Sequence, residues 1–258
     1  SLHRSLENLL TLQRRIEDEL VPQMRSAAAE LDAAPLTDLS DAGLVAEIRR
    51  RWEINQYWAK VYWDDFIPFA HGMRLFGQVY NEVMVPEDPY VFMNLLKHQD
   101  LLSLQRNRAL ARLAEGVRRH PQRQNALAGN DLKGLDPDFR RDLDDFIQRY
   151  GDLSCTVTGA VDCAPDAGTL PNMILEMAKL PITPVTDEKA AEATRLEAEF
   201  LQSCPVNMAD TCRDLLSVAR ASYRLRDDDN IILGAIEAQL IAAAQEGRRR
   251  AAAGNHII

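Results

Sequence analysis

The sequence is poor in long hydrophobic runs, in cysteine and in aromatic residues, and its charge leans to one sign. No stretch approaches 18 consecutive uncharged apolar residues, which excludes a transmembrane helix. The first residues, Ser1-Leu2-His3-Arg4, lack a basic region followed by an apolar run, so no signal peptide is expected. Lys and Arg number 30 against 39 Asp and Glu, and the net charge of −9 disfavours general affinity for nucleic acid. We therefore expect a cytoplasmic protein that binds neither a membrane nor nucleic acid.

Cysteine is limited to four residues: Cys155, Cys163, Cys204 and Cys212. They form two pairs, each with seven intervening residues, whereas structural zinc pairs are usually separated by two to four residues so that one tight turn presents both sulfurs. A disulfide is disfavoured without an export signal. We expect reduced thiols that are partly buried as small hydrophobic side chains.

The familiar catalytic motifs are also missing. The sequence contains no Gly-x-Gly-x-x-Gly, no Walker loop, no Gly-x-Ser-x-Gly and no His-Glu-x-x-His. Of the five histidines, only His71 lies inside an apolar and aromatic stretch. That position is compatible with a hydrogen-bonded histidine in a core or groove, with a ligand contact, or with acid–base chemistry.

What the sequence does have is helical periodicity. Its 258 residues are 46% apolar, enough to bury a substantial core, and apolar residues recur at spacings of three and four with almost no alternating runs. We predict an all-α fold, in which long antiparallel helices form an irregular bundle in a single domain over residues 1–258. The predicted helices cover residues 1–33 with a kink at Pro22, 40–65, 73–83 after a bend or interruption at Pro68, 89–117 with an interruption near residues 99–100, 138–150, 170–180, 189–203, 206–223 and 227–250. Residues 120–137 are predicted to be a surface connection and residues 151–168 a long structured loop.

The few aromatic residues are concentrated in one region. Three tryptophans, six tyrosines and seven phenylalanines make 16 aromatic residues, of which 11 lie between Trp52 and Phe92. On a helix, Trp52, Trp58 and Tyr62 do not share one narrow stripe, so the rings surround much of the helix. Two interpretations remain open: a central helix packed on all sides, or a groove for a ligand or a neighbouring domain.

Two charged segments allow more than one interpretation. Asp64 and Asp65 are adjacent, and adjacent helical side chains point about 100° apart, so a shared metal ion is disfavoured and a solvated helical face is expected. Arg220, Arg224 and Arg226 suit recognition of a carboxylate or phosphate, but three aspartates follow at 227–229. This segment is a salt-bridged helix junction, an anion site or a docking surface.

Three segments together resemble one family, the phosphoenolpyruvate synthase-like proteins, which include rifampicin phosphotransferase. Residues 146–152, Phe-Ile-Gln-Arg-Tyr-Gly-Asp, are similar to the family's Phe-x-x-x-Tyr-Gly segment. Residues 222–228, Ser-Tyr-Arg-Leu-Arg-Asp-Asp, resemble its Arg-Leu-Arg-Glu-Asp segment before a long terminal helix. Residues 66–77, with Pro-Glu-Asp-Pro at 86–89, look like the preceding helical region. The family often has a histidine after Tyr-Gly, where this chain has Asp152.

The resemblance covers about residues 40–250 and implies a division of labour. In the family, an ATP-grasp-type domain binds ATP and magnesium, and a swivelling domain carries a phosphorylatable histidine within Gly-Gly-x-x-Ser/Thr-His. A helical region lies between them and holds the substrate in the rifampicin enzymes. This chain lacks the histidine motif and the nucleotide-binding glycine loop, so it resembles the helical region only. It would not be catalytically complete alone, and it would hold no cofactor itself.

From these observations we expect a substrate-binding or linker domain of an ATP-dependent phosphotransferase. Its partners would be a small-molecule acceptor and the nucleotide-binding and phosphohistidine domains of the same polypeptide. No catalytic or metal-binding residue is predicted. The predicted contacts are an aromatic wall and polar groups near element junctions: Trp58, Tyr62, His71, Arg74, Tyr80, Tyr150, Asp152 and Arg224. Two alternatives remain: a stand-alone helical binding or scaffold module with an aromatic groove, and an independent helical enzyme that uses Asp64, His71 and Arg74.

Overall fold

The computed structural model describes residues 1–97, 101–150, 169–180 and 188–254, and every regular element within these ranges is helical. The predicted all-α fold is therefore confirmed. No described helix is both long and apolar enough to cross a membrane. The predicted loop over 151–168, with Cys155 and Cys163, lies outside the described residues.

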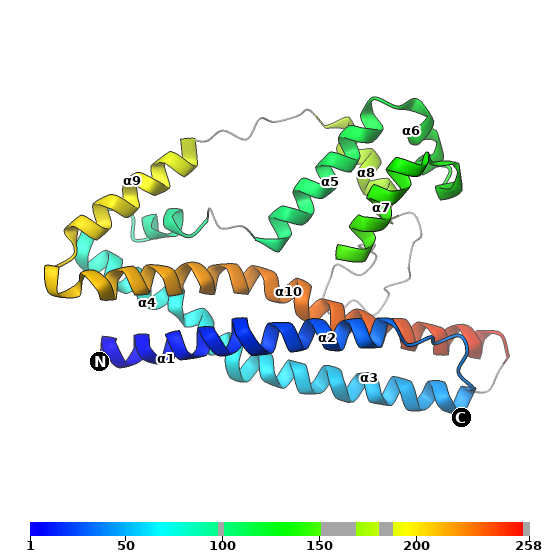
Figure 1. Cartoon of the computed structure of the whole chain (residues 1–258), viewed down its shortest axis with the longest axis horizontal. Helices are drawn as coiled ribbons and strands as arrows, with labels where there is room; N and C mark the ends of the chain where they lie inside the picture. Colours follow the sequence, from blue (N-terminus) through cyan, green and yellow to red (C-terminus); the bar gives the residue numbers. More distant parts are fainter. Residues whose placement is uncertain (98–100, 151–168, 181–187, 255–258) are drawn as a thin grey trace. The chain divides into compact units, whose positions relative to one another are not determined.

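The elements follow one another in this order (Figure 1): α1 (Leu2–Arg14), the π-helical turn η1 (Arg15–Leu20), α2 (Val21–Asp32), α3 (Asp41–Val61), the π-helical turn η2 (Tyr62–Phe66), α4 (Ile67–Met84), the 3₁₀ turn η3 (Val91–Leu95), α5 (Leu102–Arg118), α6 (Pro121–Ala128), the 3₁₀ turn η4 (Leu132–Gly134), α7 (Pro137–Tyr150), α8 (Thr169–Lys179), α9 (Glu188–Ser203), the 3₁₀ turn η5 (Val206–Met208) and α10 (Ala209–Ala252).

The chain divides into two compact units, each described by itself below. The first takes in Ser1–Ala34, Arg50–Leu101 and Val185–Ile236, and the second Pro35–Arg49, Leu102–Pro184 and Glu237–Ile258. Helices α3 and α10 contribute residues to both units. The single domain expected from the sequence stays a prediction.

Two prolines inside predicted helices are accommodated by π-helical turns. Pro22 follows η1 and Pro68 follows η2. At the end of η2 the Ile67 N–H donates to the Tyr62 carbonyl five residues back, and η1 ends in the same pattern. The wider turn relieves the clash between a proline ring and the carbonyl four residues before it. Of the bend or interruption predicted at Pro68, the interruption is therefore wrong, because the helix continues through Pro68.

A close approach of α4 to α10 organises the first unit. A Cβ atom added at Gly72 would lie 2.9 Å from Val218 Cγ1 and 3.4 Å from Ser222 Cβ, so only glycine lets the helices meet at this distance. One turn earlier, the buried Ser222 hydroxyl donates a 3.0 Å hydrogen bond to the Phe69 carbonyl. The contact thus joins segments about 150 residues apart in the sequence.

Aromatic packing extends this core toward α9, which turns through η5 into α10 (Figure 1). Phe76 and Tyr80 of α4 place their rings 5.3 and 5.4 Å from the ring of Phe200 on α9. All three side chains are almost fully buried. Cys204 and Cys212, at either side of η5, are free and buried, as predicted for these two thiols.

The second unit contains a separate core, formed where α5 packs against α7 and α8 and where α6 packs against α8 (Figure 1). Its buried side chains recur at helical spacing, as the sequence pattern predicts. They are Leu110, Leu113, Ala114, Val117, Leu127, Leu135, Phe139, Leu143, Phe146, Leu170 and Ile174.

Three local predictions are corrected by the structure. Residues 120–137 are not only a surface connection, because Pro121 begins α6 and Leu127 is buried. The first part of the helix predicted over 89–117 is instead the 3₁₀ turn η3, after Asp88 accepts the Tyr90 N–H at 2.9 Å, and α5 follows from Leu102. The predicted interruption near residues 99–100 lies at the gap in the described residues. The helices predicted over 206–223 and 227–250 are one continuous helix, α10.

The continuity of α10 changes the role of the aspartates at 227–229. Asp228 and Asp229 lie in the helix interior and are only 7% and 4% exposed. Both have polar partners, and for Asp229 one of these is the Tyr62 hydroxyl. Because the carboxylates are satisfied there, they do not start a new helix.

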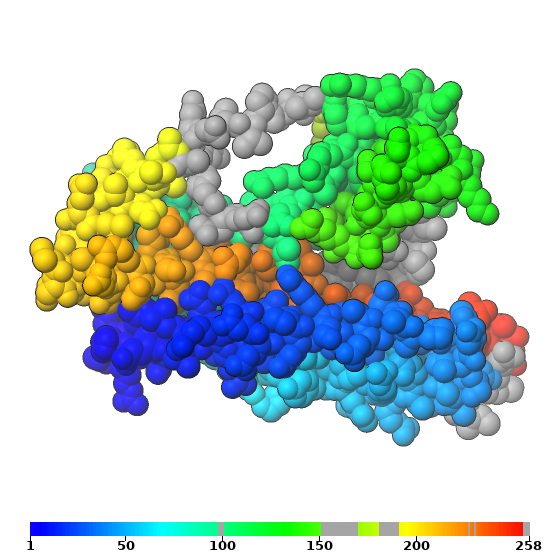
Figure 2. Space-filling view, viewed as in Figure 1, coloured from blue at the N-terminus to red at the C-terminus, as the bar shows by residue number. Residues whose placement is uncertain are grey.

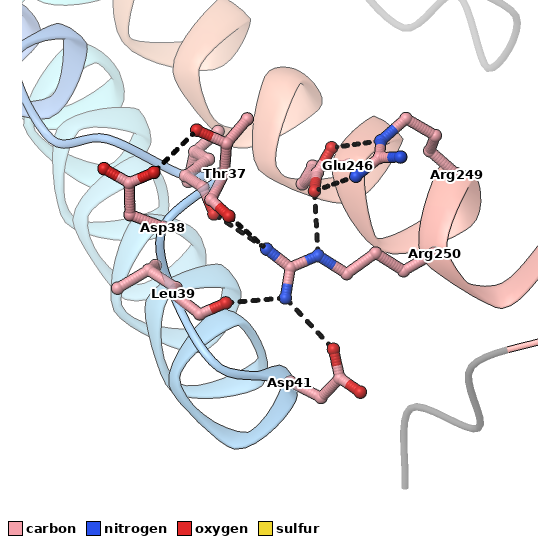
Figure 3. A network of polar contacts seen from close by, with 8 residues as sticks. Thr37, Asp38, Leu39, Asp41, Glu246, Arg249 and Arg250 are labelled. Atoms are coloured by element: carbon pink, nitrogen blue, oxygen red, sulfur yellow. Dashed lines mark hydrogen bonds and ion pairs between the residues drawn. The ribbon is translucent and has the colours of Figure 1, made fainter. Parts of the chain in front are cut away.

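A buried arginine holds the connection before α3 within the second unit (Figure 3). The Arg250 side chain is 8% exposed and donates to the backbone carbonyls of Leu36, Thr37 and Leu39 at 3.0, 3.3 and 2.7 Å. It also binds the carboxylates of Asp41 at 3.0 Å and Glu246 at 2.8 Å. One guanidinium therefore satisfies carbonyls that no regular element pairs.

We expect Gly72→Ala to lower the free energy of unfolding by about 1–3 kcal/mol, because the added methyl group must displace Val218 in a packed core. The matched control is Gly234→Ala in α10, where a Cβ meets nothing within 4 Å. That change should raise stability by about 0.5–1 kcal/mol, the usual gain of alanine over glycine in a helix. Chemical denaturation measures both. Equal effects at the two positions would contradict the close contact.

The Arg250 network predicts a specific loss of stability in acid. Hydrogen bonds from Arg249 and Arg250 lower the pKa of Glu246 to about 2, from an ordinary 4.5. A depressed carboxyl pKa stabilises the fold above the ordinary value, and the contribution disappears as pH falls from 4.5 toward 2. Glu246→Gln should therefore reduce the drop in denaturation midpoint between pH 5 and pH 3. Glu176→Gln, in the exposed pair with Lys179, serves as the control and should leave that drop unchanged.

Candidate functional site

A groove between α1 and α4 in the first unit contains two of the predicted contact residues, His71 and Arg74. We call it the His71 groove; its volume is about 460 Å³. Its lining comes from two helices: Ser5, Asn8, Leu9 and Leu12 of α1, and Pro68, His71, Arg74, Leu75 and Gln78 of α4.

Helical spacing explains why these residues share one groove. On α1 the lining positions are separated by three, one and three residues, and on α4 by three, three, one and three, so each set forms one stripe. Leucine and proline carbons provide an apolar surface, and serine, asparagine, histidine, arginine and glutamine provide polar groups. Such a combination suits a small molecule with an apolar body and a few hydrogen-bonding groups.

The polar side chains of the His71 groove are free of partners within the described part of the chain. No hydrogen bond or ion pair to a described residue involves the side chains of Ser5, Asn8, His71, Arg74 or Gln78. Arg74 is an exception among the arginines facing the grooves of the first unit, since Arg213, Arg220 and Arg224 each bind a carboxylate. Its guanidinium remains available to bind a carboxylate or phosphate group.

Arg224 and Tyr62 instead contact charged residues away from the His71 groove: Arg224 contacts η1, and Tyr62, in η2, contacts Asp229 of α10. Arg224 forms an ion pair with Glu17 of η1, and Arg15 of η1 pairs with Asp65 of η2 at 3.3 Å. Burial raises the pKa of the Tyr62 hydroxyl, and the neighbouring charge and hydrogen bond of Asp229 raise it further. The ion pair with Glu17 supports the interpretation of Arg224 as part of a salt-bridged helix junction. Only its Nη2 is used in this pair, so other guanidinium N–H donors remain.

Two of the predicted aromatic contacts are core residues. Tyr80 is 1% exposed in the aromatic core of α4 and α9, and burial is the main reason that its pKa is raised. Trp58 is 5% exposed, yet it borders a second hollow of about 440 Å³ between α2 and α3, together with Tyr57. The Tyr57 ring packs edge-on against the Trp58 ring, with 5.0 Å between the ring centroids.

The remaining predicted contacts belong to the other unit or lie outside the described residues. Tyr150, at the end of α7, is half-buried against Phe146 at 5.2 Å, with the Arg149 guanidinium 5.2 Å from its ring. Asp152 lies outside the described residues. Among the predicted contacts that it describes, the structure therefore brings together only His71 and Arg74.

The sequence interpretation missed the α1 side of the groove. Ser5 and Asn8 lie beside the apolar stripe of the first helix, where polar residues usually face solvent, so the sequence pattern does not indicate a site there. Gln78 follows His71 by seven residues, and this helical spacing is the signal that could have identified it.

The described residues include no group of three or more His, Cys, Asp or Glu side chains placed to hold a metal ion. In comparisons with known proteins, no family model matches the sequence, and no curated protein or solved structure is significantly similar to it. The resemblance to phosphoenolpyruvate synthase-like proteins therefore remains a prediction from the quoted segments.

We expect His71→Ala and Arg74→Ala each to change the free energy of unfolding by less than about 0.5 kcal/mol, because neither side chain has a described partner. Ser222→Ala, which removes a buried hydrogen bond in the same unit, should cost about 0.5–1.5 kcal/mol. Denaturant titration of the three variants checks this. A loss at Arg74 as large as that at Ser222 would mean that the groove side chains are structural.

Proposed function

We propose that this chain is the helical substrate-binding and linker domain of a phosphoenolpyruvate synthase-like phosphotransferase. In this proposal, phosphate passes from ATP, bound with magnesium on another domain, through a phosphohistidine to a small acceptor. The described residues contribute acceptor binding and domain docking, and the chain supplies no phosphohistidine of its own.

The observation that carries the proposal is the contact between two of the family-like segments. Gly72 of the segment 66–77 packs against Val218 and Ser222 at the start of the segment 222–228, and Ser222 hydrogen-bonds to Phe69. The meeting of these two segments at a close, glycine-dependent contact supports the interpretation that both belong to one inherited helical junction.

The His71 groove is the acceptor site in this proposal. One of its two walls is α4, which contains most of the 66–77 segment. The groove has a volume of about 460 Å³, and its lining combines apolar carbons with unpartnered polar groups. Arg74 can hold an anionic or carbonyl group of the acceptor, and His71 can donate or accept a hydrogen bond. Neither is assigned a covalent role.

The decisive experiment asks where phosphate is attached. Incubated with ATP and Mg²⁺, this chain should gain no phosphate on His71, as monitored by mass spectrometry under conditions that preserve phosphohistidine. The coding sequence beyond the two ends should include a Gly-Gly-x-x-Ser/Thr-His segment, and in the full-length protein that histidine should be labelled. Labelling of His71, or steady ATP hydrolysis by this chain that Arg74→Ala abolishes, would instead support an independent helical enzyme.

A stand-alone binding module is the second candidate function, and one observation favours it. Trp52 and Tyr57 of α3 and Trp63 of η2 are 54%, 56% and 67% exposed, and Tyr57 also borders the same hollow as Trp58. Exposed aromatic residues of this kind often mark contact surfaces. Start and stop codons directly bounding these residues, with no phosphohistidine motif in the gene, would favour this module over the transferase domain.

A further inference from the structure

A second groove in the first unit, separate from the His71 groove, is lined by three arginines. Arg213, Arg220 and Arg224 project from α10 into a cavity of about 360 Å³, whose other walls include Glu197 of α9 and Gln13 of α1. The space-filling view shows the dark blue surface of α1 adjoining the yellow and orange surfaces of α9 and α10 (Figure 2). We call this the arginine groove.

The arginines form one stripe because of their spacing. Positions 213, 220 and 224, with Ser217 between them, follow each other by seven and four residues and so lie on one side of the helix. This side carries three guanidinium groups and one hydroxyl, and the facing wall contributes the Gln13 amide and a single carboxylate, Glu197. The lining itself contains three arginines and one glutamate, and Glu17 and Asp210 pair with Arg224 and Arg213 from outside the lining, so each guanidinium has one carboxylate partner.

Neighbouring groups hold these guanidinium groups without using all of their donors. Arg220 donates through Nε to the Leu95 carbonyl at 3.1 Å and through Nη2 to Glu197 at 2.6 Å, which fixes the plane of its guanidinium. Its Nη1 has no partner among the described residues. Preorganised donors bind an anion better than flexible ones, because less side-chain entropy is lost on binding.

The other two arginines are each paired through one nitrogen only. Arg224 binds Glu17 through Nη2, and Arg213 binds Asp210 through Nη1. Asp210 is 95% exposed, and exposed ion pairs contribute little free energy, so a more highly charged ligand can displace or share them. A phosphate group carries nearly two negative charges and three acceptor oxygens at neutral pH, which suits a groove lined by several guanidinium groups.

We propose that the arginine groove binds the phosphate group of a small molecule. This site goes beyond the proposed function, and it does not depend on it, because its residues differ from those of the His71 groove. Free phosphate and a phosphomonoester share the recognised chemistry. The Arg213–Ser217–Arg220 face grips the phosphate oxygens, and Glu197 is the competing anion already in place.

The test is isothermal titration of the whole chain at pH 7.5 and constant ionic strength, first with inorganic phosphate and then with glycerol phosphate. We expect saturable binding of at least one of the two. Arg213→Gln should weaken it by about tenfold or more, the usual effect of losing one charge-assisted hydrogen bond. This variant removes only an exposed ion pair, so the fold should remain intact, as circular dichroism will show.

Two further variants separate a phosphate site from a general charge effect. Arg195→Gln removes another exposed arginine, paired with Glu199 at 2.6 Å on α9, and should leave affinity within about twofold. Glu197→Gln removes the competing negative charge, while the amide oxygen can still accept the hydrogen bond that orients Arg220. It should therefore tighten binding by about threefold or more, a gain that a merely structural residue would not produce.

Binding of glycerol phosphate at least as tight as that of inorganic phosphate assigns the site to phosphorylated small molecules, and binding of inorganic phosphate alone assigns it to the free ion. Absence of saturable binding for both probes, equal losses in Arg213→Gln and Arg195→Gln, or weaker binding in Glu197→Gln would each overturn the proposal. None of these outcomes bears on the labelling of His71, so failure here leaves the proposed function standing.

Discussion

The close approach of α4 to α10 at Gly72 is the constraint on which the first unit depends. With Gly72 facing Val218 and Ser222, the rotation of α4 is set, and each further residue turns by about 100°. His71 and Leu75 then lie about a quarter of a turn or less away, on the side that faces α1. On α10 the same contact leaves the stripe of Arg213, Arg220 and Arg224 on another side. One missing side chain thus positions two different grooves.

The two grooves differ in how their polar groups are satisfied. Around the His71 groove, the polar side chains have no described partner, so a ligand would replace only water. In the arginine groove each guanidinium already binds a carboxylate, so a ligand must compete with Glu197 and its neighbours. The first arrangement suits a neutral or singly charged molecule with apolar surface, and the second needs a strong anion. Under the two proposals, the grooves would therefore bind ligands of different chemistry.

Helical periodicity made most of the fold predictable. The all-α class and the helices from residue 1, 40, 138, 170 and 189 follow from apolar spacing and capping residues, and all are present. The errors have local physical causes. Pro68 was expected to bend or interrupt a helix, but the helix continues, because a π-helical turn precedes the proline and accommodates its missing N–H. Asp228 and Asp229 were expected to open a helix, but burial beside polar partners keeps them inside α10. Pro68 is accommodated by the turn directly before it, whereas Asp229 is contacted by Tyr62, which is distant in the sequence.

By itself the sequence determined the helical class, the aromatic concentration in Trp52–Phe92 and the pairing of His71 with Arg74, since residues three apart on a helix must be neighbours. Only the tertiary structure decided which of these residues are accessible. Trp58 and Tyr80 are buried, whereas Trp52 and Trp63 are exposed, because burial depends on which helix packs against each side. It also brought Ser5 and Asn8 to His71, a meeting of two helices that spacing within either one cannot specify.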